Sequence, residues 1–137
     1  MLKQISVFAD NRPGMANAIM KTLKANKINA CAMTISESNE YGIVRLVVDN
    51  TSKAADVLRE NDFTIKIADV TCVSLPDELG ALSNAMQILE DNDINIRYAY
   101  LMSGKDSSNA NIIIRTENPD KAEEILTKAG VKLISHD

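Results

Sequence analysis

The 137-residue chain has no tryptophan, and aromatic residues make up only 4% of it. Proteins that hold single-stranded nucleic acid stack its bases on aromatic rings, and phosphate backbones are held mainly by lysine and arginine. The net charge is -4 and the isoelectric point is about 5.0. We therefore expect no nucleic-acid partner and a core built from aliphatic side chains and methionine.

Cysteine, histidine and long apolar runs are also scarce. Cys31 and Cys72 stand alone without CxxC spacing, so we interpret both as small buried hydrophobic residues, with a disulfide or redox pair as the alternative. His136 is the only histidine and lies in the terminal two residues, where we expect a solvated tail. These residues predict no metal site, no catalytic residue and no cofactor.

No segment of about 18 consecutive apolar residues is present, and the amino terminus lacks the basic and apolar pattern of a signal peptide. We expect a soluble, cytoplasmic protein without a membrane partner. Apolar residues make up 45% and charged residues 25% of the chain, which is typical of globular domains.

The chain contains an internal repeat. When residues 10–16 are laid over residues 76–82, Gly14 falls on Gly80, an offset of 66, and residues 26–29 fall on residues 92–95. Further along, the offset becomes 68. The second copy therefore has two additional residues, which we place in the polar loop at 103–109.

Each copy changes its hydrophobic period in the same order, which predicts strand, helix, two strands, helix and strand. The predicted elements are 4–7, 15–23, 31–35, 43–48, 54–58 and 63–67, then 70–75, 79–89, 94–101, 110–115, 122–128 and 131–134. We expect Thr51 or Ser52 to cap the helix at 54–58. The six methionines are expected to fill the cores. Tyr98 and Tyr100 alternate in phase with Ile94 and Ile96, which predicts an aromatic face at a seam between repeats or copies, with the lining of a ligand pocket as the alternative.

The order βαββαβ, twice, predicts the α/β class, as an α+β sandwich of two ferredoxin-like units in tandem with antiparallel sheets and helices on one face. We set the domains at residues 1–67 and 68–137. Only Ala68 and Asp69 separate the predicted strands of the two copies, so no flexible linker is expected. The copies would pair edge strands in one wide sheet or exchange a terminal strand.

Each copy places a glycine turn between its first strand and first helix. The first backbone N–H groups of a helix lack partners and carry the positive end of the helix dipole, so a carboxylate or phosphate is favoured there. Gly14 and Gly80 would let a ligand approach these groups. An ordinary β-turn followed by a helix is the alternative interpretation.

The turn at 10–15, with Pro13 and Gly14, and the strand start at 27–30 resemble the ACT domain, a small regulatory βαββαβ module. The resemblance covers essentially the whole chain, once per repeat. It implies binding of an amino acid or similar carboxylate effector at an interface between domains, by a protein that regulates without catalysis of its own. It also implies a homodimer and a regulated enzyme partner.

The resemblance implies a site at two sets of positions: Asp10, Asn11, Gly14, Met15 and Asn29 in the first repeat, and Asp77, Leu79, Gly80, Ala81 and Asn95 in the second. In the second turn Leu79 replaces the family's proline and Asp77 replaces an amide with a carboxylate. We therefore expect unequal sites, with the first turn closer to the family pattern.

Two other functions remain open from the sequence. Arg12 in the turn and Asn29 on the next strand faintly resemble the arginine and asparagine of acylphosphatases, which share this sandwich and are hydrolases. A structural or partner-binding protein with empty turns is the other.

Overall fold

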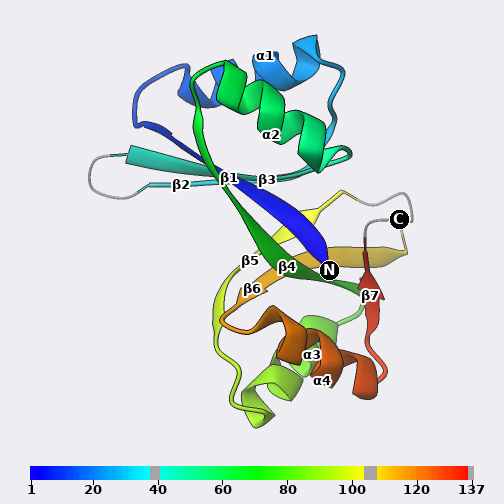
Figure 1. Cartoon of the computed structure of the whole chain (residues 1–137). Helices are drawn as coiled ribbons and strands as arrows, with labels where there is room; N and C mark the ends of the chain where they lie inside the picture. Colours follow the sequence, from blue (N-terminus) through cyan, green and yellow to red (C-terminus); the bar gives the residue numbers. More distant parts are fainter. Residues whose placement is uncertain (38–40, 104–107, 136–137) are drawn as a thin grey trace. The chain divides into compact units, whose positions relative to one another are not determined.

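The computed structural model describes residues 1–37, 41–103 and 108–135, so His136 and parts of two predicted hairpin loops lie outside the described residues. The elements, in chain order, are β1 (Leu2–Asp10), α1 (Met15–Ala25), β2 (Ala30–Glu37), β3 (Tyr41–Val48), α2 (Thr51–Glu60), β4 (Thr64–Pro76), α3 (Ala81–Asp91), β5 (Ile96–Met102), β6 (Asn109–Thr116), α4 (Pro119–Lys128) and β7 (Lys132–Ile134) (Figure 1). The predicted fold is confirmed: within these residues, seven antiparallel strands and four helices form βαββαβ units in tandem.

The chain divides into two compact units, which we call the first unit (Lys3–Ala68) and the second unit (Asp69–Asp137 with Met1–Leu2). Strand order is β2-β3-β1-β4 in the first unit and β5-β6-β4-β7 in the second. The two strands predicted on either side of Ala68 and Asp69 are one continuous strand, β4.

Each unit has its own aliphatic core between one sheet face and two helices that lie on the same side of that sheet (Figure 1). Leu58 of α2 and Leu126 of α4 occupy equivalent places in the two cores and are fully buried. The methionines fill these cores less than predicted, because five of them are half-buried and Met33 is exposed.

The second helix of each unit is capped by an asparagine. Asn50 and Asn118 accept hydrogen bonds from the backbone N–H groups of Lys53 and Lys121, each at 3.1 Å. The predicted cap at Thr51 or Ser52 is therefore wrong, because the helix begins at Thr51 and the extended residue before it satisfies the free N–H group.

A shift of register reverses the face of β5. Ile96 pairs with Thr116 but Tyr98 pairs with Arg115, so one additional residue separates the two pairs. A β-bulge of this kind turns the following side chains to the other face of the sheet. Tyr98 and Tyr100 stack with ring centroids 6.4 Å apart, on the face opposite to Ile96, and their predicted phase is wrong.

The two cysteines are free and differ in accessibility. Burial in β4 raises the pKa of the Cys72 thiol to about 11, whereas Cys31 is half-buried. At pH 8 about one thousandth of Cys72 is thiolate, the reactive form. We expect iodoacetamide to label Cys31 first and Cys72 only slowly in the folded protein, as mass spectrometry of labelled peptides would show. Equal labelling rates without denaturant would contradict this assignment.

Candidate functional site

Side chains of the first glycine turn interact within the turn and with the end of β2. Gly14 precedes α1 with φ 91°, a left-handed conformation that favours glycine, and no side chain caps the helix. The Asn11 amide donates a hydrogen bond to Glu37 Oε2 at the end of β2, at 2.8 Å. Arg12 Nε lies 3.8 Å from Asp10 Oδ2. The Glu37 carboxylate thus occupies one of the two N–H donors of the Asn11 amide and places a negative charge beside it.

The second turn has the same backbone and different surroundings. Gly80 precedes α3 with φ 85°, again without a side-chain cap. The Asp77 N–H donates to the Ser108 carbonyl at 3.2 Å, and the Glu78 N–H donates to the Pro76 carbonyl at 2.8 Å. Leu79 is fully exposed. The turn is thus held by backbone hydrogen bonds.

A cavity of about 400 Å³ adjoins this second turn, within the second unit. Its volume is in the range of small-molecule sites. Leu79 and Ala81 of the predicted site line it. Further apolar lining comes from Leu75, Ala85, Ile88 and Val131, and polar lining from Glu78, Asn84, Asn109 and Lys132.

The cavity offers both kinds of charge that an amino acid requires. The uncapped start of α3 favours a carboxylate, and the Glu78 carboxylate favours an ammonium group. Lys132 pairs with Ser74 on the sheet face opposite to the core residues Val73 and Leu133, so its side chain points away from α3. The Asn109 amide is oriented by a hydrogen bond that it donates to Ser74 Oγ, at 3.2 Å. The cavity can therefore accept a small zwitterion with an apolar side chain.

Several residues that line this cavity are smaller than the equivalent residues of the first repeat. Ala81, Ala85 and Asn109 stand where the first repeat has Met15, Ile19 and Tyr41, and Ser74 and Val131 stand where it has Phe8 and Phe63. In the first unit the Phe8 and Tyr41 rings are in contact, with centroids 6.0 Å apart. Sequence reasoning missed Asn84, Asn109 and Lys132, although comparison of residue volumes between the repeats would have indicated this position.

The predicted asparagines lie at the other end of the first helix of each unit. Asn29 follows α1 and Asn95 follows α3, each helix being 11 residues long, which is about 16 Å. One unit does not bring Asn29 to Gly14, or Asn95 to Gly80. For the same reason Arg12 and Asn29 do not form an acylphosphatase-like pair within the first unit.

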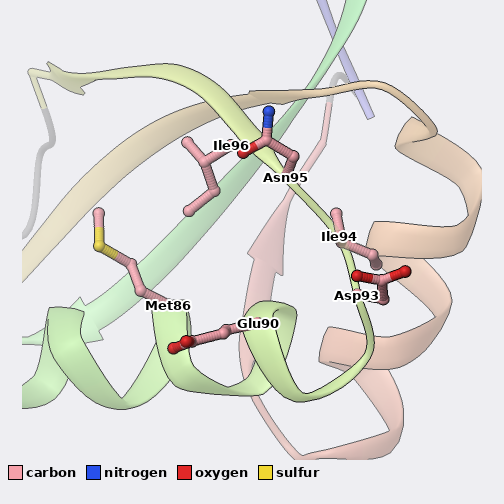
Figure 2. A pocket seen from close by; sticks show the side chains of 6 residues that line it. All are labelled: Met86, Glu90, Asp93, Ile94, Asn95 and Ile96. Carbon is pink, nitrogen blue, oxygen red and sulfur yellow. The ribbon is translucent and has the colours of Figure 1, made fainter.

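Each asparagine instead borders a groove at the end of its helix. The grooves measure about 420 Å³ at Asn29 and 400 Å³ at Asn95. In Figure 2, Met86 and Glu90 project from α3, and the Asn95 amide points away from that helix. The Asn29 N–H donates to Asp49 Oδ1 at 3.1 Å.

The described part of the chain contains no group of three or more histidine, cysteine, aspartate or glutamate residues placed to hold a metal ion. Among the same residues, no helix combines the length and the apolar character needed to cross a bilayer.

The fold and its two glycine turns define a class, the tandem pair of small βαββαβ domains. Residues 1–137 match the family described as ACT domain pair, and the chain belongs to that family. A comparison with curated proteins gives no match.

Solved structures share this fold over nearly the whole chain. Protein BT0572 from Bacteroides thetaiotaomicron is 33% identical, with a TM-score of 0.90, and the alignment covers 97% of this chain and 91% of that one. The regulatory subunit of aspartate kinase from Thermus thermophilus, in a ligand-free form, is 16% identical with a TM-score of 0.67, covering 93% and 91%. The corresponding subunit from Thermus flavus is 15% identical with a TM-score of 0.62, covering 95% and 94%. At such low identity, the TM-scores of these two subunits show a common fold alone.

Proposed function

We propose that this chain is a regulatory protein that binds a small amino-acid-like ligand in the cavity beside the second turn. The observation that carries this proposal is the joint presence of Glu78 and the uncapped start of α3 beside one cavity of about 400 Å³. An apolar floor between them fits a small side chain. Membership of the ACT domain pair family supports a regulatory role.

The site residues predicted from the sequence have different roles in this proposal. Leu79 and Ala81 line the cavity, and Gly80 lies between them in the chain. Asp10, Asn11, Gly14 and Met15 form the equivalent turn, whose Asn11 amide is engaged by Glu37, so we assign that turn the weaker binding. Because a helix separates Asn29 and Asn95 from the turn of their own unit, another ACT repeat would have to bring an asparagine to a bound ligand.

The effect of ligand binding is proposed to act on another protein. A regulatory protein without catalysis of its own needs a target, such as an enzyme. A bound ligand changes an equilibrium between arrangements only by the difference in its affinity for them. A ligand that binds more tightly to one arrangement would raise the population of that arrangement. The partner would then respond to the ligand concentration through the amount of this arrangement.

A thermal-shift screen with the twenty amino acids tests the site. At a hundredfold excess over its Kd, a ligand stabilises the native state by about 2.7 kcal/mol, so at least one amino acid should raise the melting temperature by several degrees. Glu78→Gln should remove most of that shift, because it deletes the charge that recognises the ammonium group of the zwitterion.

Glu117→Gln is the matched control, since Glu117 is exposed and does not line this cavity. The control should retain the full shift. If no amino acid stabilises the protein at millimolar concentration, and Asn11→Ala with Gly80→Val leaves its behaviour unchanged, a structural protein with empty turns is the better description.

A further inference from the structure

Two buried threonines distinguish the core of the second unit from that of the first. Thr71 lies in β4 and Thr116 at the end of β6, and each has only 1% of its surface exposed. At the offsets of 66 and 68 they correspond to Ile5 and Val48, which belong to the core of the first unit. The second core thus carries two hydroxyl groups at positions where the first core is aliphatic.

The two threonines are neighbours on the sheet face that carries the helices. Thr71 pairs with Ile114, and Thr116 follows Ile114 by two residues on the same strand, so all three point to one face. Ile114 and Leu126 of α4 belong to the core of the second unit on that face. Residues placed diagonally on adjacent antiparallel strands have Cβ atoms less than about 8 Å apart. The two hydroxyl groups therefore share one region of the core.

Neither hydroxyl group is satisfied by the protein itself. The Oγ1 atoms of Thr71 and Thr116 are buried and form no hydrogen bond within the part of the chain that the structure describes. Burying a polar group without a partner is unfavourable, and native proteins pair nearly all such groups with protein atoms or ordered water. Two such groups side by side in one core indicate a shared partner from outside the chain.

We propose that Thr71 and Thr116 bind one internal water molecule, which joins β4 to β6 inside the second unit. One water can bridge two hydroxyl oxygens up to about 5.5 Å apart, which is two hydrogen-bond lengths. Threonine is smaller than isoleucine by one methyl group, a space comparable with the volume of about 30 Å³ that a water occupies in the liquid.

Water fits this position better than an ion does. Both ligating groups are neutral hydroxyls, and the residues around them are aliphatic, so an ion would be buried without an opposite charge. A hydroxyl group both donates and accepts, which suits a water in either orientation. This site needs no amino-acid ligand and goes beyond the function proposed above.

Three valine variants test the bridge, because valine has the shape of threonine without the hydroxyl group. Thr71→Val alone or Thr116→Val alone would leave the other hydroxyl on a water that has lost one partner. We expect backbone amides of α4 to exchange hydrogen about tenfold faster in each single variant, measured by mass spectrometry. The double variant should exchange within about threefold of the wild type, because two apolar side chains of the same shape need no water.

Thr64→Val is the matched control, since Thr64 is exposed at the start of the same strand, β4. Exchange in α4 should be unchanged in this variant. A crystal structure of the wild type should show one water within about 3 Å of both Oγ1 atoms. The variant that combines Thr71→Ile with Thr116→Val copies the first repeat and should lack that water, because isoleucine fills its space.

The signs of these effects distinguish a bridged pair from two isolated hydroxyls. If the single variants exchange at the wild-type rate or more slowly, the hydroxyls share no partner and the water site is wrong. A wild-type crystal structure with a direct bond between the two hydroxyls, or with no water between them, would also overturn it. None of these measurements involves an amino acid, so a negative thermal-shift screen would count against the function proposed above and leave this site intact.

Discussion

Leu126→Ala should lower the free energy of unfolding by about 2–5 kcal/mol, measured by urea denaturation. Leu126 has no exposed surface and packs from α4 into the core of the second unit, beside Leu89 and Ala122. Truncation removes favourable burial and leaves a cavity that the surrounding strands and helices fill only in part. Leu58→Ala should have an effect of similar size in the first unit, where Leu58 occupies the equivalent place on α2.

Leu79→Ala is the control for these two changes, because Leu79 is fully exposed in the second turn. Its effect on stability without ligand should stay within about 0.5 kcal/mol. A loss below about 1 kcal/mol for Leu126→Ala would show that α4 packs more loosely against the sheet than its burial indicates.

The repeat made most of this fold predictable. Two copies of one hydrophobic pattern, related through Gly14 and Gly80, define the element order twice. An element that one copy indicates only weakly is therefore also indicated by the equivalent segment of the other copy. The structure adds one element-level difference, because Ala68 and Asp69 continue a single strand. Neither residue is a glycine or a proline, so nothing in this connection interrupts the extended backbone.

Details that depend on hydrogen bonding between strands were beyond the sequence. The bulge at Arg97 turns Tyr98 to the face opposite Ile96, while the alternation of the residues themselves is unbroken. The cap of α2 was misplaced by one residue, since Asn50, Thr51 and Ser52 are all good capping residues and the backbone angles decide among them.

The candidate site was predictable in its turns and not in its cavity. Gly14 and Gly80 both adopt the left-handed conformation that the turn requires. Whether space exists beside a turn depends on residues far away in sequence, such as Asn109 and Lys132 for the second turn. Those residues enter the site only through the pairing of β4 with β6 and β7, and a motif search centred on the turn does not reach them.

Filling the cavity with the first repeat's own residues should abolish ligand binding at the second turn. The variant Ala81→Met copies Met15, and the longer side chain would occupy the space that a ligand needs. We expect affinity for the amino acid that stabilises the wild type to fall at least about a hundredfold, a loss of about 2.7 kcal/mol by titration calorimetry.

The reciprocal variant, Met15→Ala, is the matched control for cavity filling. It removes side-chain volume at the first turn and should leave the affinity of the second turn unchanged. The filled variant should itself remain folded, because Met15 already occupies the first position of α1, the place that Ala81 has in α3. Undiminished affinity in the filled variant would place the ligand elsewhere in the chain. Loss of binding in both variants would instead mean that the two turns act together on one ligand.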